Sequence, residues 1–114
     1  MTNKTVLMCP PDHFDIEYEI NAWMHTDNQV EHSLAVQQWQ QLYGIYTQQL
    51  NWNVKLMPAT EGLPDLVFTA NGGLVISGQV ALPRFRQPER QGETALDEAW
   101  FQQNGFTDIF LPNH

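Results

Sequence analysis

Four short apolar runs that each end at a proline divide this chain into strand-sized pieces, and they constrain its fold more than any other feature. Proline has no backbone N–H and cannot continue the hydrogen-bond ladder inside a sheet, so it marks where a strand stops. We expect a buried strand at Lys4–Cys9 and further strands at Val54–Met57, Gln79–Leu82 and Asp108–Leu111, closed by Pro10, Pro58, Pro83 and Pro112.

Two further strands are expected between residues 66 and 77, at Leu66–Ala70 and Leu74–Ser77. Glycine adopts the positive φ that tight turns require. Gly72-Gly73 and Ser77-Gly78 are therefore predicted to form the turns that separate these strands from each other and from the next.

A helix is predicted over Glu31–Leu50, where apolar residues recur at spacings of three and four. Glutamine fills the opposite side, and Asn51 is expected to end the helix. The predicted apolar face consists of Ala35, Trp39, Leu42, Tyr46 and Leu50.

A second helix is predicted to start at Thr94, after the polar loop RFRQPERQGE. Thr94 and Asp97 have the spacing of a capping box, and Gly105 stands where a C-terminal capping glycine belongs. The residues expected to face the core are Leu96, Trp100 and Phe101.

Strands and helices thus alternate along the chain, which indicates an α/β fold. The stretch DHFDIEYEINAWMHTDNQ has no clean period and is expected to be a long ordered loop. The order helix, short strand, proline occurs twice, at Val54–Pro58 and at Asp108–Pro112, which is a weak sign of two copies of one supersecondary unit. No domain linker is evident, and 114 residues suit one small domain.

Charge and cysteine content narrow the possible partners and location. The net charge is −8, with five Lys and Arg, so nucleic acid and anionic membranes are unexpected partners and cationic ligands are favoured. The single cysteine, Cys9, makes no internal disulfide and fits a reducing cytoplasm. Neither a membrane-spanning run nor a signal peptide is recognisable, so we expect a cytoplasmic protein.

The residues alone suggest one possible ligand site, around Asp65 and Asn71. Both are ordinary turn residues beside Pro64 and Gly72, and both are also planar oxygen acceptors suited to a guanidinium. Among Arg84, Arg86 and Arg90, one could clamp a carboxylate, or all three could form exposed ion pairs; spacing does not choose.

Other chemistry is not indicated. The four histidines lack metal-ligand spacing, no cofactor-binding loop is present, and Cys9 in a buried strand is expected to be structural. No metal and no cofactor are therefore predicted.

Two longer segments, CPPDHFDIEYEINAWM and GLPDLVFTANGGLV, resemble the opening of the amidinotransferase, arginine deiminase and dimethylarginine dimethylaminohydrolase superfamily. The arginine dihydrolase branch is the nearest, and the resemblance continues through QWQQLYGIYTQQL, RFRQPERQGE and WFQQNGF. It implies a pentein fold, an α/β propeller of ββαβ-type modules, of which residues 1–114 would be the N-terminal portion and supply about two modules.

The resemblance also implies substrate-binding residues for an arginine-like guanidino compound. It matches Asn21 to an asparagine of an INPWM-like loop, Asp65 to an acid facing the guanidinium, and Phe68 to an aromatic pocket wall. Asn71 matches the asparagine of a TAN motif, and Arg90 matches a carboxylate clamp.

The family's catalytic acid, general-base histidine and nucleophilic cysteine would all follow the equivalent of Pro112, and Cys9 does not match the nucleophile. The resemblance therefore implies a truncated guanidino-modifying hydrolase that carries substrate-binding residues, is inactive alone and binds arginine weakly or not at all. The alternative is a non-catalytic binding or assembly module that self-associates, because a partial ring exposes sheet edges. Either a homo-oligomer or complementation by the C-terminal portion is expected.

Overall fold

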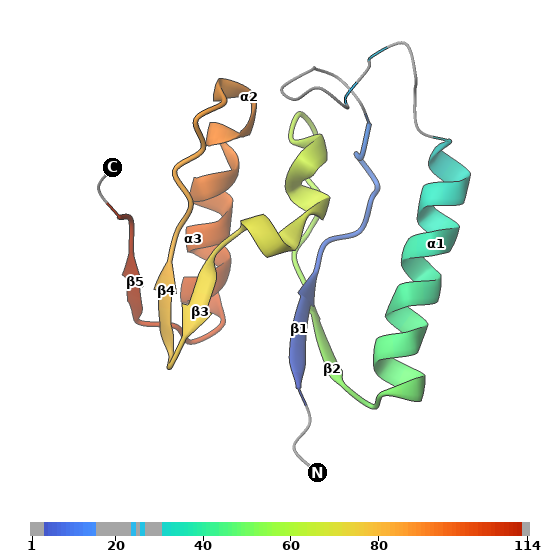
Figure 1. Ribbon diagram of the computed structural model, residues 1–114, viewed down its shortest axis with the longest axis horizontal. Coiled ribbons are helices and arrows are strands. Elements are labelled where there is room, and N and C mark those ends of the chain that lie inside the picture. The colour runs from blue at the N-terminus through green and yellow to red at the C-terminus, as the bar shows by residue number, and fades with distance from the viewer. Residues whose placement is uncertain (1–3, 16–23, 25, 27–30, 113–114) are drawn as a thin grey trace. The chain divides into compact units, whose positions relative to one another are not determined.

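The computed structural model describes residues 4–15, 24, 26 and 31–112, and the chain divides into two compact units, Met1–Val67 and Phe68–His114 (Figure 1). Each unit contains a strand, a helix and a second strand that pairs with the first in parallel. The predicted α/β alternation is confirmed. Among the described helices, none is long and apolar enough to cross a membrane.

The first unit is built on the parallel pair β1 (Thr5–Met8) and β2 (Asn53–Leu56), drawn side by side in Figure 1. Their register runs from Thr5 opposite Asn53 to Met8 opposite Leu56. Helix α1 (His32–Gly44) precedes β2 and continues as one stretch of π-helix, η1 (Ile45–Gln49). Asn51, with a φ of 54°, then ends the helical segment as predicted.

The predicted apolar face of α1 is only partly covered by the described chain. Ala35, Trp39 and Tyr46 are half-buried, but Leu42 and Leu50 are 43% and 44% exposed. None of the residues of α1 is buried. The spacing of apolar residues therefore predicted the helix correctly, but the helix is less buried than the pattern indicated.

The strand predicted at Leu66–Ala70 is wrong. Two short 3-10 helices stand there, η2 (Pro64–Val67) and η3 (Thr69–Asn71). The apolar run LVF resembles a strand in sequence, but Pro64 presets helical φ at the first position of η2, and backbone bonds then close tight turns. Leu66 N donates to Leu63 O, and Asn71 N donates to Phe68 O at 3.0 Å.

The second unit has a three-stranded sheet of β3 (Leu74–Ile76), β4 (Gln79–Ala81) and β5 (Asp108–Phe110). The order is β3-β4-β5, with β4 antiparallel to β3 and parallel to β5. Ser77 and Gly78 both have positive φ, 51° and 81°, so the predicted tight turn joins β3 to β4.

Helix α3 (Glu93–Gln103) connects β4 to β5 and packs on this sheet (Figure 1). Its Phe101 joins Val80 and Leu82 in the buried core, with Trp100, Phe106 and Ile109 packed around them. A short helix, α2 (Pro88–Gln91), lies in the stretch predicted as a loop. The capping-box prediction is wrong: Thr94 Oγ1 instead donates to Pro83 O at 3.0 Å.

Gly72 and Gly73 have a role different from the predicted one. Neither has a positive φ. A Cβ on Gly73 would lie 2.9 Å from Cε2 of Phe101, and a Cβ on Gly72 would lie 2.9 Å from Oδ1 of Asp97. The glycines therefore let α3 approach the η3–β3 backbone, and the close neighbours are α3 side chains.

Candidate functional site

The Arg90 guanidinium is the centre of the polar cluster in the second unit. Its Nε and Nη2 donate to the two carboxylate oxygens of Glu93 at 2.8 and 2.9 Å. Its Nη1 donates to Oδ1 of Asn71 at 3.1 Å, and Cζ lies 4.4 Å from the centroid of the Phe85 ring. A planar cation is thus held by a two-point carboxylate contact, an amide oxygen and an aromatic face.

The Arg90–Glu93 pair is mostly buried, so the expectation of an exposed ion pair is wrong for Arg90. The Arg90 and Glu93 side chains are 12% and 3% exposed, so they do not form a solvated surface pair. Arg84 donates to the carbonyl of Pro112, and Arg86 is exposed. Of the three arginines, Arg90 is therefore the one that the structure brings to a predicted site residue.

Two acids occupy the buried face of α3. Glu93, Asp97 and Phe101 follow at spacings of four, so they lie on one side of the helix. Glu93 and Asp97 are each 2% exposed. Sequence reasoning missed both, because acids at this spacing normally face water. The available signal was that they share a helical face with Phe101 and that Arg90 precedes Glu93 by three residues.

Asp97 has an unusual environment for a carboxyl group. Burial, followed by the charge of Glu93, raises the pKa of Asp97 to about 7, while the nearby Arg90 acts to lower it. Its Oδ2 is buried and accepts or donates no hydrogen bond among the described residues. A carboxyl with these neighbours is mostly protonated below pH 7, since burial disfavours the charged form.

The remaining predicted site residues are distributed as follows. Asp65 lies in η2 of the first unit and is 5% exposed. Phe68, between η2 and η3, is 48% exposed. Asn21 lies outside the described residues. Within the second unit, the structure thus joins Asn71 and Arg90.

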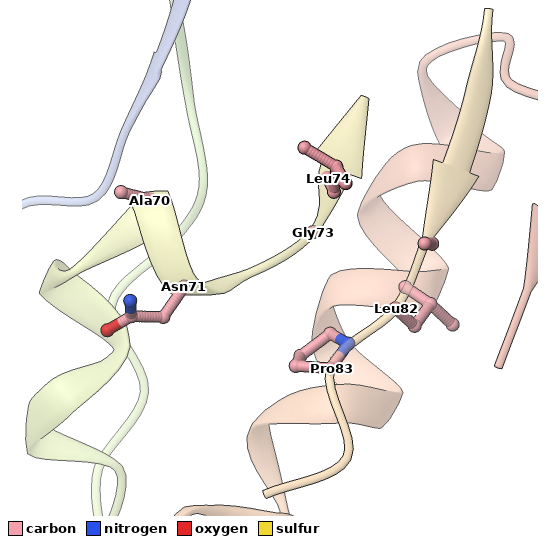
Figure 2. A pocket seen from close by; sticks show the side chains of 7 residues that line it. Ala70, Asn71, Gly73, Leu74, Leu82 and Pro83 are labelled. Carbon is pink, nitrogen blue, oxygen red and sulfur yellow. The ribbon is translucent and has the colours of Figure 1, made fainter. Parts of the chain in front are cut away.

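A pocket of about 330 Å³ lies beside Asn71, at the ends of β3 and β4 (Figure 2). Asn71 supplies its one polar side chain, and Figure 2 shows the amide directed away from Leu82 and Pro83. The other lining residues are Ala70, Gly73, Leu74, Ala81, Leu82 and Pro83. Its volume is at the lower end for small-molecule sites, and its walls suit an aliphatic group.

The described part of the chain contains no group of three or more His, Cys, Asp or Glu side chains arranged to hold a metal ion. This site can bind a charged, planar group of a ligand through hydrogen bonds. Arg90 offers charged N–H groups, Asn71 offers an amide, and the buried acids hold the arginine in place.

The chain is similar to three curated enzymes. It is 48% identical over 107 residues to the bifunctional arginine dihydrolase/ornithine cyclodeaminase AgrE of Nostoc sp.. It is 45% identical over 108 residues to the bifunctional arginine dihydrolase/ornithine cyclodeaminase ArgZ of Synechocystis sp.. These matches cover 93% and 94% of the chain and 15% of each relative. The N(G),N(G)-dimethylarginine dimethylaminohydrolase of Mycobacterium tuberculosis is 37% identical over 102 residues, covering 90% of the chain and 33% of that enzyme.

Solved structures agree with these sequence matches. The N-terminal domain of cyanobacterial ArgZ, bound to product, superposes with a TM-score of 0.86 at 41% identity, over 98% of the chain and 40% of that domain. A dimethylarginine dimethylaminohydrolase adduct superposes with a TM-score of 0.73 at 20% identity, over 98% of the chain and 41% of that protein, and this likeness concerns the fold alone. No protein-family model matches the chain.

The chain is therefore a homologue of the guanidino-group-modifying enzymes of the pentein superfamily. More narrowly, its relatives are the arginine dihydrolases ArgZ and AgrE together with dimethylarginine dimethylaminohydrolase, and it matches the N-terminal part of ArgZ. The resemblance noted from the sequence is confirmed. The chain spans about 15% of the length of the two cyanobacterial relatives.

Proposed function

We propose that residues 1–114 are the substrate-binding N-terminal portion of a cytoplasmic guanidino-modifying hydrolase of the arginine dihydrolase type, about two pentein modules, and have no turnover by themselves. The observation that carries this is the 48% identity to AgrE, which spans 93% of the chain. A structure of an AgrE variant contains L-arginine, and a cysteine-to-serine variant of the ArgZ domain is bound to substrate. L-Arginine is accordingly the ligand that we infer.

In this proposal each predicted residue has a role defined by its chemistry. Asp65 and Asn71 are planar acceptors for the ligand's guanidinium, and Phe68, half-exposed, offers an aromatic wall. Arg90 offers charged donors to the ligand's carboxylate, and Asn21 is a further predicted ligand contact. The catalytic acid, the general-base histidine and the nucleophilic cysteine belong to a C-terminal portion.

The wild-type chain is expected to bind L-arginine at most weakly and to release no ornithine, citrulline or ammonia from it. Asp65→Asn should weaken that binding by about tenfold or more, because a carboxylate contact to a guanidinium contributes roughly 1.5–3 kcal/mol. Titration calorimetry measures the binding, and a coupled ammonia assay measures the turnover. Asp12→Asn, which changes an exposed acid of the same unit, is the matched control and should bind like wild type.

Unchanged affinity in Asp65→Asn, with the fold intact by circular dichroism, would remove Asp65 from the site. Steady turnover by the pure chain would refute the inactive-alone proposal. Addition of a C-terminal portion should restore turnover if the two portions assemble.

The alternative, a self-associating module, is supported by strand β3. It stands at one edge of its sheet, and Leu74, Val75 and Ile76 are 62%, 46% and 59% exposed. An apolar edge strand favours pairing with another strand.

Sedimentation is expected to detect a concentration-dependent dimer or larger oligomer. Val75→Lys should shift it toward monomer, because a charged residue on an edge strand opposes pairing. Lys substitution of Gln79, an exposed residue on the central strand β4, is the control. A wild-type monomer at high concentration would exclude the assembly role.

A further inference from the structure

Glu93 contacts Arg90 in a way that fixes the guanidinium in its plane. Both carboxylate oxygens accept from one edge of it, at 2.8 and 2.9 Å, and the Glu93 side chain is 3% exposed. A two-point contact removes rotation that a single hydrogen bond would allow. Stacking of Arg90 on Phe85 at 4.4 Å restrains the same plane from its face.

The consequence extends to Asn71. Because Arg90 Nη1 donates to Asn71 Oδ1 at 3.1 Å, the oxygen of this amide is directed toward Arg90. An amide that flips exchanges a donor for an acceptor, so its orientation determines what a ligand meets. Asn71 borders the 330 Å³ pocket, and its orientation there follows from the position of Arg90.

Asp97 lies one helical turn beyond Glu93 on the same buried face of α3. Its pKa is raised to about 7 by burial and by the charge of Glu93. While it is protonated it does not compete with Glu93 for the guanidinium. Its Oδ1 faces Gly72, which directly follows Asn71, so the α3 acids pack against the backbone that carries Asn71.

We propose that Glu93 is a positioning residue, which holds the Arg90 guanidinium against Asn71 and thereby sets the orientation of both side chains for the ligand. This inference rests on the proposed function, in which Arg90 and Asn71 contact L-arginine. Glu93 itself is not a ligand contact in this proposal and acts through Arg90.

The test is nuclear magnetic resonance of the 114-residue chain, using Glu93→Gln and, as a matched control, Glu89→Gln. Glu89 is an exposed acid next to Arg90 on α2. The readout is hydrogen exchange of the Arg90 Nε–H, which Arg90→Lys assigns by its disappearance. Exchange of the Leu82 amide, which donates to Phe110 O, reports on the fold.

In Glu93→Gln, exchange of the Arg90 Nε–H should accelerate by about tenfold or more, since the charge-assisted acceptor is lost. The Leu82 amide should keep its protection. Binding of L-arginine, followed in the same spectra, should weaken by about tenfold, as one hydrogen-bonded charge is no longer held in place. Glu89→Gln should match wild type in all three readouts.

If wild type binds L-arginine and Glu93→Gln binds it equally well, Glu93 has no positioning role while the proposed function stands. If wild type binds no L-arginine, the proposed function fails and this inference fails with it. Should Glu93→Gln not fold, Glu93→Asp keeps the charge on a shorter side chain, and unchanged Arg90 exchange and arginine affinity in that variant would overturn the proposal.

Discussion

As pH rises, the Asp97→Asn variant is expected to gain stability relative to wild type. Its free energy of unfolding, compared with that of wild type, should be about 3 kcal/mol higher at pH 8 than at pH 4.5. The pKa of Asp97 is raised from 3.8 to about 7, chiefly by burial. The unfolded chain therefore releases this proton at lower pH than the folded chain does. The stability that the protonated group contributes is complete below pH 3.8 and is lost progressively as pH rises to about 7.

Asparagine has the shape of the carboxyl group and no charge, so it removes this pH dependence. Its amide would place N–H groups where Oδ2 has no described partner, at a cost of about 1–3 kcal/mol if they stay unpaired. That cost is independent of pH. The diagnostic quantity is therefore the slope of the stability difference against pH and not its value at one pH.

Urea denaturation of wild type and Asp97→Asn across this pH range measures the slope. Asp108→Asn removes an exposed carboxyl from the same unit and controls for the change in net charge. Parallel curves for wild type and Asp97→Asn would show that the buried carboxyl does not retain its proton. A difference that changes in the opposite direction, with Asp97→Asn losing stability relative to wild type as pH rises, would contradict the expected sign.

Much of the strand and helix pattern was predictable from the sequence because its signals are local. Proline ends a strand wherever it occurs, and Ser77-Gly78 and Asn51 adopt the positive φ that their turns need. The segment from Pro64 to Asn71 was not predictable in this way. Its apolar run favours a strand, and only the tertiary setting selects two 3-10 turns.

The candidate site was likewise predictable from the sequence only in part. The resemblance named Asn71 and Arg90 separately, and their contact required the fold to bring α2 beside η3. The burial of Glu93 and Asp97 was not predictable from residue type, because isolated acids prefer water. Burial becomes favourable for Glu93 because Arg90 neutralises its charge, and for Asp97 when this carboxyl keeps its proton.

Phe101→Ala is the second substitution with a large expected effect, a loss of about 3–5 kcal/mol in the stability of the second unit. Phe101 is 4% exposed and packs with Val80 and Leu82. Its ring meets Trp100 and Phe106 edge-on, with centroids 5.3 Å away in each case. Gly73, with no side chain, cannot fill the space that the ring would leave.

Hydrogen exchange of the Leu82 amide, bonded to Phe110 O, measures the free energy of opening in this unit. Phe110→Ala is the matched control: its side chain is 47% exposed, so it should cost only about 1 kcal/mol. Because Phe101 shares the buried face of α3 with Glu93 and Asp97, its loss should also expose the Arg90 Nε–H to exchange. Equal losses of stability in the two variants would contradict the role of Phe101 in this core. An Arg90 signal that stays protected in Phe101→Ala would show that the polar cluster is held independently of the core.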